Sequence, residues 1–434
     1  MILNIKGDVD NITKRQLEFI SDVLSKQRIV VNNVVIENVG EKGDNYGSQV
    51  KRIKVQYKNG GEFKMIAKVR PDNMKIQNQT VKSVFINEII MFNEVLPKFK
   101  ELQENVFVPK EDLFQYPLCY GTLDERDNEI LLLEDLSVSN FFTLDKLKPL
   151  DNDTVKLVLN NIANMHSLSC VLRKKEPQLF NKILDALFHP LFHPNNMTKT
   201  RIFLENILKD FEAVFETSRY RNIIVDIMNV LVNASMELMS SDSKSKYSVI
   251  QHGDLWTNNI MFLIQVCIYV FPTNIQSLTV DNQKLMCTFI DYQLSRDSLP
   301  VSDILYFIFT CTDYKTRLKH YLNWMDFYHS ELDRHLSYFD LKVDDVYPRQ
   351  NFDADLKRYA KPALGMSFFV LNFSLRSPQE APDLVMANID GTEQIPQFKM
   401  GALSDKTFET INERVEGVIE SCFDFGYLTD VNRI

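Results

Sequence analysis

The residues best suited to chemistry lie in two short segments in the second half of the chain. Residues 251–260 read QHGDLWTNNI and contain Asp254 and Asn259, and residues 289–293 read FIDYQ and place Asp291 directly after an apolar pair. A carboxylate can orient and deprotonate an attacking hydroxyl, while a second carboxylate and an amide oxygen can hold Mg²⁺ against nucleotide phosphates. The combination predicts phosphoryl transfer, with Asp254 as the base and with Asn259 and Asp291 as magnesium ligands.

Each of these residues alone has an ordinary structural explanation, because Asp and Asn often cap backbone amides in turns. Their order, however, matches that of a kinase catalytic loop, in which His and Asp are followed after four residues by Asn and later by a metal-binding Asp. Gly253 stands where that loop usually has Arg. The whole combination is much harder to obtain by accident than any single residue, and we therefore favour a catalytic centre.

Such a centre needs a nucleotide-binding region upstream, and the first third of the chain has the expected elements. Residues 62–69 have the pattern of a strand, and Lys68 near its end is a candidate for contacting the α- and β-phosphates. Residues 85–96 carry apolar side chains at helical spacing, include Glu88, and are followed by Pro97, which we expect to close the helix. A strand Lys paired with a helix Glu positions phosphates in kinase-like folds, whereas either residue alone is usually a surface charge.

Two further segments are candidates for nucleotide binding. Gly43, Asn45 and Ser48 lie in a glycine-punctuated segment between two strand patterns, where backbone amides and the Ser48 hydroxyl could approach phosphates. An ordinary hairpin turn explains this segment equally well, and only its position in the chain favours phosphates. Glu134 and Leu136 follow a short apolar strand pattern and mark the expected hinge, where backbone groups would hold adenine; the alternative is a plain strand exit.

These segments resemble the ecdysteroid kinase-like family of arthropods, which is related to choline and aminoglycoside kinases. The resemblance covers most of the chain and rests on GDNY at 43–46, FINE at 85–88, LEDL at 133–136, HGDLWTNN at 252–259, IDYQ at 290–293 and DILYF at 303–307. It implies an α+β, bilobal protein-kinase-like fold, with a small β-rich N-lobe at 1–135 and a larger, mostly helical C-lobe at 136–434. It also implies transfer of the γ-phosphoryl group of ATP, with Mg²⁺, to a hydroxyl of an ecdysteroid or a similar apolar alcohol.

The resemblance assigns the same roles to the chemical residues and makes Lys68 the phosphate lysine. Asp303 is expected to be structural, because a carboxylate at this position can accept hydrogen bonds from the backbone of the catalytic loop. His252 is expected to be a packed histidine that braces the same loop. Both residues would support the catalytic centre without taking part in the chemistry.

One departure from the family pattern is the long connection between Asn259 and Asp291, which contains an additional apolar segment at 263–272. We consider two explanations for the insertion at 263–288: part of it is a retained intron or gene-model error, or it is a genuine longer hairpin. If the insertion displaces Asp291, the magnesium site fails.

Two other functions stay open at this stage. A choline- or ethanolamine-type kinase would need an acidic, aromatic-lined site for a cationic acceptor. A catalytically impaired, nucleotide-binding pseudokinase would typically lack one of Lys68, Asp254, Asn259 and Asp291, and all four are present. The aromatic segments 306–309 and 368–371 could line an apolar acceptor cavity, although core packing is the more common use of such residues.

Composition narrows the classes of partner. The 434 residues carry a formal net charge of −9, which disfavours nucleic acids and anionic membranes as partners. The first residues lack the pattern of a signal peptide, and no run of about eighteen apolar residues occurs, so we expect a cytoplasmic protein. We also expect a monomer. Six scattered cysteines have no metal-binding spacing and are expected to be reduced, buried thiols. The repeat LFHPLFHP at 187–194 predicts a turn, because its prolines would break a helix that could align the two histidines.

Overall fold

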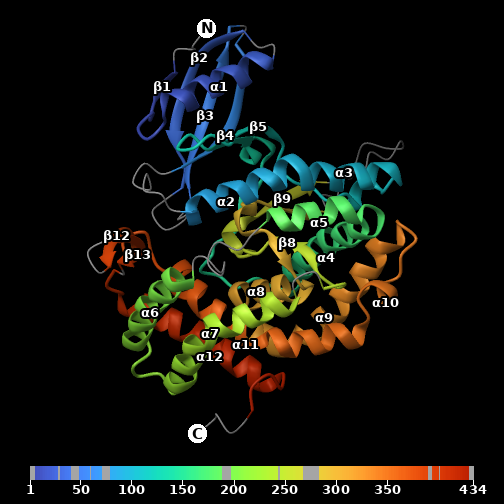
Figure 1. Ribbon diagram of the computed structural model, residues 1–434, viewed down its shortest axis with the longest axis vertical. Helices are drawn as coiled ribbons and strands as arrows, with labels where there is room; N and C mark the ends of the chain where they lie inside the picture. The colour runs from blue at the N-terminus through green and yellow to red at the C-terminus, as the bar shows by residue number, and fades with distance from the viewer. Residues whose placement is uncertain are drawn as a thin grey trace, which may run out of the picture.

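The computed structural model describes residues 5–27, 30–40, 48–58, 60–70, 79–187, 197–242, 245–266, 283–389, 393–399 and 401–429. A sheet-rich N-terminal region is followed by a helical C-terminal region, which Figure 1 shows as the upper and lower parts of the molecule. The mixed α+β class expected from the sequence is therefore confirmed.

The N-terminal region is built on one six-stranded sheet with the strand order β1-β2-β3-β4-β6-β5. Its strands are β1 (Ile5–Gly7), β2 (Val31–Asn38), β3 (Gln49–Tyr57), β4 (Glu62–Val69), β5 (Cys119–Leu123) and β6 (Ile130–Glu134). Only the β1–β2 pair is parallel. Alternate residues of the central strands, such as Ile53 and Val55 on β3, pack with Ile20 and Leu24 of helix α1 (Lys14–Lys26) in one apolar cluster. The strand predicted at 62–69 is confirmed, and its pairing fixes the position of Lys68.

A nearly continuous helical segment leads out of the first part of the sheet. It consists of α2 (Gln79–Ile90), a π-helical turn η2 (Met91–Val95) and α3 (Leu96–Asn105). The prediction that Pro97 closes the helix is wrong, because the chain stays helical to Asn105. The N–H of Leu96 bonds to the carbonyl of Met91, five residues back, and this wider turn lets proline enter at the start of the next helix, where its missing N–H is tolerated.

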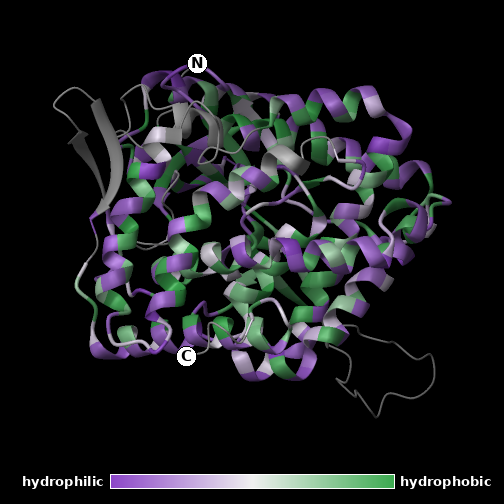
Figure 2. Cartoon of the chain, turned by 60° about the horizontal axis from the view of Figure 1, so that its bottom comes forward, coloured by the Kyte–Doolittle hydropathy of each residue, from purple (hydrophilic) through white to green (hydrophobic). Residues whose placement is uncertain are grey.

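The C-terminal region packs its helices around one large apolar cluster. The helices are α4 (Asn152–Lys175), α5 (Pro177–Ala186), α6 (Met197–Val214), α7 (Arg221–Asp242), α8 (Pro300–Cys311), α9 (Tyr314–Ser337), α10 (Val343–Val346), α11 (Arg349–Ser374) and α12 (Asp405–Asp424). Figure 2 shows hydrophobic residues gathered toward the interior of this region and hydrophilic residues on its outer faces. Phe307, Phe309 and Phe368 are fully buried in the cluster, so these aromatic residues serve the core.

Short strands between the large helices carry the residues of the candidate site. They are β7 (Phe142–Thr143), β8 (Val249–Gln251), β9 (Ile260–Val266), β10 (Gln283–Phe289) and β11 (Arg296–Ser298). Strands β9 and β10 are antiparallel, with pairs running from Ile260–Phe289 to Val266–Gln283. The described ends of the insertion thus extend a hairpin and do not separate Asp291 from Asn259. A second hairpin, β12 (Asp383–Ile389) with β13 (Glu393–Lys399), lies near α6 in Figure 1.

Several expectations concern residues outside the described ranges. They include Gly43 and Asn45, the middle of the insertion at 267–282, and all but the first residue of the LFHPLFHP repeat. The five described cysteines are free, four of them buried and Cys119 half-buried. Within the described ranges, no helix is both long and apolar enough to cross a bilayer.

Candidate active site

The loop that follows β8 needs glycine at its second position. Gly253 has a φ of +86°, a conformation that side chains with a Cβ rarely adopt. A Cβ at this residue would also lie 2.2 Å from the carbonyl oxygen of Leu294 and 2.7 Å from Nη1 of Arg296. These contacts give a physical reason for Gly253 where kinase catalytic loops usually have Arg.

We expect Gly253→Ala to lower the free energy of unfolding by about 2–5 kcal/mol, because it combines backbone strain with a clash against a fixed carbonyl. Gly60→Ala is a matched control, since Gly60 has a φ of +87° and a Cβ added there would meet nothing within 4 Å. The control should lose about 1 kcal/mol from backbone strain alone. Urea denaturation of both variants measures the difference, and equal losses would contradict the packing argument.

His252 holds the loop after β8 in place through both nitrogens of its ring. Its ring is fully buried, with Nε2 3.0 Å from the carbonyl oxygen of Ile290 and Nδ1 3.3 Å from the backbone N of Asp254. Because Nδ1 must accept the N–H of Asp254, the ring is neutral with its proton on Nε2. Burial lowers the pKa of His252 and so favours this neutral form. The expected bracing role of His252 is confirmed.

Asp303, in the first turn of α8, holds the same loop from the helical side. Its Oδ2 accepts the backbone N–H of His252 at 2.8 Å, and its Oδ1 accepts that of Gly253 at 2.9 Å. His166 adds a contact of 3.2 Å to Oδ2 and is itself held by the hydroxyl of Tyr328. Burial alone would raise the pKa of Asp303, but the contacts with His166, His252 and the N–H of Gly253 together outweigh it and keep the pKa below its ordinary value. The structural role expected for Asp303 is confirmed, whereas nothing in the sequence pattern indicated His166 or Tyr328.

Asp254 has both carboxylate oxygens occupied by hydrogen-bond donors. The hydroxyl of Tyr306 donates to Oδ1 at 2.5 Å, and Nδ2 of Asn259 donates to Oδ2 at 3.0 Å and to the backbone oxygen at 2.9 Å. Burial raises the pKa of Asp254 to about 7, with a further contribution from the charge of Asp291. The hydrogen bonds from Tyr306 and Asn259 oppose this rise, because they stabilise the ionised form.

Tyr306 contacts the candidate base, although the sequence predicted an apolar environment for it. We expected it in an apolar segment, but its hydroxyl reaches Asp254 while the following residues, Phe307 and Phe309, are buried in the core. The available signal was its position three residues after Asp303, since residues three apart lie on the same side of a helix.

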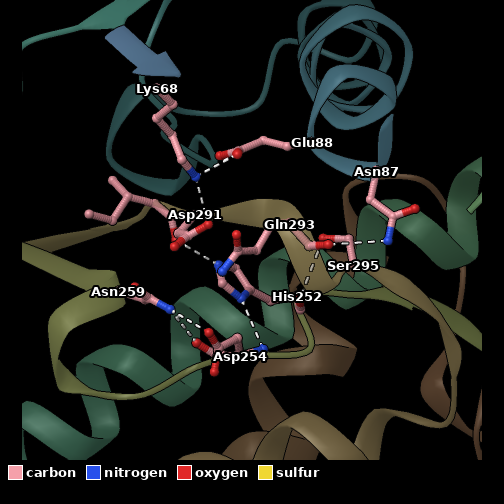
Figure 3. A network of polar contacts seen from close by, with 10 residues as sticks. Lys68, Asn87, Glu88, His252, Asp254, Asn259, Asp291, Gln293 and Ser295 are labelled. Carbon is pink, nitrogen blue, oxygen red and sulfur yellow. Dashed lines mark hydrogen bonds and ion pairs between the residues drawn. The ribbon is translucent and has the colours of Figure 1, made fainter. Parts of the chain in front are cut away.

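Lys68 connects the sheet to the segment after β10. Its Nζ lies 2.5 Å from Oε2 of Glu88 on α2 and 2.7 Å from Oδ1 of Asp291, as Figure 3 shows. Lys68 and Glu88 are buried. Burial alone would lower the pKa of Lys68, but the negative charges of Asp291 and Glu88 outweigh it and raise the pKa, so the ammonium stays charged. Burial raises the pKa of Glu88 to about 7.

The pairing of β9 with β10 holds Asp291 next to Asn259. The N–H of Ile290 donates to the backbone oxygen of Asn259 at 3.0 Å, one step beyond the Ile260–Phe289 pair. Asp291 then adopts a φ of +68°, which is uncommon for a residue other than glycine and marks a strained position. Such strain is frequent at functional sites, where the surrounding structure holds it in place.

The donor atoms around Asn259 and Asp291 fit a hard divalent cation. Nδ2 of Asn259 is engaged by Asp254, which leaves its Oδ1 to act as a ligand, and Oδ1 of Asp291 contacts Lys68, which leaves Oδ2. Mg²⁺ prefers such oxygen ligands and usually completes its coordination with phosphate oxygens and water. Among the described residues, no group of three or more His, Cys, Asp or Glu side chains forms a separate metal site.

Ser48 lies at the end of the sheet that carries Lys68. It directly precedes β3, in which Val50 pairs with Lys68 on β4. The Ser48 side chain is largely buried. The register therefore brings the end of the glycine-containing segment close to Lys68, and phosphate contacts from Ser48, Gly43 and Asn45 stay predictions.

The hinge candidates lie where β6 leaves the sheet. A carboxylate oxygen of Glu134 accepts the backbone N–H of Leu118 at 3.0 Å, so this side chain supports the neighbouring segment. Leu136 is buried at the start of the short helix η4 (Leu136–Ser139), and the preceding Asp135 forms an ion pair with Arg52 at 2.6 Å. The prediction that backbone groups here hold adenine is untested.

The site has the arrangement of a kinase-type enzyme. Lys68 pairs with Glu88 and contacts Asp291, and Asp254 and Asn259 lie beside them. Residues 42–341 match the profile of the Ecdysteroid kinase-like family, and the chain belongs to this family. The match spans every candidate catalytic, metal-binding and nucleotide-binding residue named above and gives the chain a small-molecule kinase-like function. No curated protein matches the chain.

Proposed function

We propose that the protein transfers the γ-phosphoryl group of ATP to a hydroxyl of an ecdysteroid or a similar apolar alcohol. The observation that carries this proposal is the contact of Lys68 with both Glu88 and Asp291, in the same site as the hydrogen-bonded pair of Asp254 and Asn259. These residues come from separate parts of the chain, and their convergence has no simpler explanation in packing. We further propose that 1–135 and 136–434 act as the two lobes of a protein-kinase-like fold.

Each side chain then has a role that follows from its contacts. Lys68, kept cationic by two carboxylates, would bind the α- and β-phosphates of the nucleotide. Asn259 and Asp291 would hold Mg²⁺, which when bound neutralises phosphate charge. Asp254 would orient the acceptor hydroxyl and take its proton as the new phosphate ester forms. Tyr306 would keep the carboxylate of Asp254 in a fixed orientation.

The charge near the base favours a neutral acceptor over a cationic one. The positive charge of the Arg296 guanidinium opposes the rise in the pKa of Asp254 that burial causes. The guanidinium donates a hydrogen bond to the carbonyl of Leu294. It also donates to the side-chain oxygen of Gln251 at 2.7 Å when the Gln251 amide is turned so that its oxygen and its nitrogen both have partners. A fixed positive charge here would repel a quaternary ammonium group, so we place choline-type acceptors second.

The acceptor class can be tested with a panel of ecdysteroids, plant-derived alcohols and choline incubated with the protein, ATP and Mg²⁺. Mass spectrometry should find a phosphorylated steroid or plant alcohol that is absent with Asp254→Asn. Phosphocholine as the main product would replace the proposal with its alternative. Nucleotide binding without any product would favour a pseudokinase.

Activity should rise with pH as Asp254 becomes ionised. Because burial raises the pKa of Asp254 to about 7, kcat/KM should fall on the acid side with an apparent pKa near that value. Tyr306→Phe removes a hydrogen bond that stabilises the carboxylate, so its acid limb should move to higher pH. Tyr347→Phe is the matched control, because the hydroxyl of Tyr347 donates to Asp355 at 2.9 Å in another part of the helical region. A pH profile unchanged by Tyr306→Phe would contradict this role.

A further inference from the structure

Two buried arginines meet at the corner where α8 ends and α9 begins. Arg317 lies in the first turns of α9 and is 0% exposed, and Arg414 lies on α12 and is 7% exposed. Arginine is rarely buried to this extent unless its charge is paired. This corner is separate from the catalytic loop and has no role in the reaction proposed above.

The hydrogen bonds of this pair account for only part of the two guanidinium groups. Arg317 donates from Nε to the hydroxyl of Ser421 at 2.8 Å and from Nη1 to the carbonyl of Thr312 at 2.6 Å. Arg414 donates from Nη2 to the carbonyl of Thr310 at 2.8 Å. Nη2 of Arg317 and both Nε and Nη1 of Arg414 are buried without a hydrogen-bond partner. Three nitrogens with their N–H groups are therefore left for a ligand.

The charge of the pair also lacks an acidic partner. No carboxylate of the described residues lies within ion-pair distance of either arginine, although the charge of Asp313 acts on both and that of Glu413 acts on Arg414. An oxygen of Asp313 is already used to cap the N–H of Thr316 at 2.8 Å. Burial and the neighbouring charge of Arg414 lower the pKa of Arg317 to about 9. Two cations at close range in a desolvated corner are unfavourable unless an anion joins them.

Other buried cations in this chain show how their charge is normally compensated. Arg376 is also almost fully buried, and it pairs with Asp210 at 3.1 Å while donating to the carbonyls of Asn372 and Gly401. Lys51 pairs with Asp8 in the same way. The corner at Arg317 is an exception within the described residues, because its two arginines have hydrogen bonds but no acidic partner.

We propose that this corner binds a small inorganic anion between Arg317 and Arg414. The unpaired guanidinium nitrogens supply donors and charge for it, and charge-assisted hydrogen bonds of this kind are strong. Gly417 on α12 lies against one of these donors, because a Cβ there would be 3.4 Å from Nη2 of Arg317. The donor atoms are enclosed by the surrounding helices, which excludes an ester with a large organic group.

The bound anion would fasten the C-terminal helix to the rest of the molecule. Arg414 lies beyond residues 42–341, whereas Arg317 lies within the family match. The ligand would thus join α12 to the α8–α9 corner. Cys311, the last residue of α8, is 3.6 Å from the hydroxyl of Thr257 in the catalytic loop, so loosening this corner would also reach the site. The first consequence to expect is on thermal stability.

The test is the melting temperature of the purified full-length protein in gluconate buffer, with chloride or inorganic phosphate titrated in at constant ionic strength. We expect a saturable rise of several degrees with at least one of the two anions, because a ligand that binds only the folded state raises its stability. Arg414→Met and Arg317→Met should abolish the rise. Arg376→Met, which removes a buried arginine with an acidic partner, should melt earlier but keep the rise.

The result is independent of turnover, so it is unaffected by failure of the proposed kinase activity. The anion that gives the saturable rise identifies the ligand class. A linear response equal to that of gluconate would overturn the proposal. So would a rise that both arginine variants retain, since the anion would then bind elsewhere.

Discussion

Asp254→Asn is expected to lower turnover about 10²–10⁴-fold, a loss of about 3–5 kcal/mol of transition-state stabilisation. Asparagine keeps the size of the side chain and an acceptor for Tyr306, but it cannot take a proton from the acceptor hydroxyl. Nucleotide affinity should change little, because Lys68 and Asp291 are untouched. Steady-state kinetics together with calorimetric nucleotide titration separates the two effects.

The same variant should lose less stability than the wild-type protein as the pH rises towards neutrality. The pKa of Asp254 is raised to about 7 in the folded protein and is about 4 in an unfolded chain, so folding favours the protonated form. Its contribution to stability is present below the unfolded pKa and is lost as pH rises to the folded one. Asparagine cannot ionise and avoids this loss. Turnover equal to wild type would sink the assignment of the base, and an equal loss of melting temperature with rising pH in both proteins would contradict the raised pKa.

Lys68→Met is expected to lower kcat/KM at least about 100-fold and to destabilise the fold by about 3–5 kcal/mol. The second effect follows from geometry, because the ammonium is the ion-pair partner of Glu88 and also contacts Asp291. Without it, a buried carboxylate is left unpaired beside another negative charge.

A double variant separates stability from activity. Lys68→Met with Glu88→Gln removes both charges of the buried pair, so most of the lost stability should return while activity stays low. Denaturation and kinetics on the two single variants and the double variant give the coupling between the residues. Additive losses of stability would contradict the ion pair, and recovered activity would contradict the phosphate-binding role of Lys68.

Local sequence patterns predicted the elements and supporting contacts around the candidate site well, because the relevant order of residues is short and specific. The strand ending near Lys68, the helix with Glu88 and the bracing residues His252 and Asp303 were all placed correctly. The prediction that the helix ends at Pro97 was wrong, because one π-helical turn accommodates a proline that would disrupt a regular helix.

The remaining parts of the site depend on contacts that sequence order does not show. Tyr306 reads as one more aromatic in an apolar run, and its contact with Asp254 exists only because α8 packs beside the catalytic loop. Likewise, Arg317 and Arg414 are 97 positions apart and look like ordinary surface charges until packing buries them together. The pairing of β9 with β10 also answers the concern about the insertion, since the register keeps Asp291 beside Asn259.

The most direct test of the central claim is transfer of the terminal phosphoryl group from isotopically labelled ATP to an alcohol, measured with Mg²⁺ present and then removed by a chelator. The account predicts label in the phosphate ester of an apolar alcohol with the wild-type protein, and almost none without Mg²⁺ or with Asp254→Asn. Label that appears equally with Asp254→Asn would contradict it, because the transfer would then not depend on the carboxylate at the centre of the site.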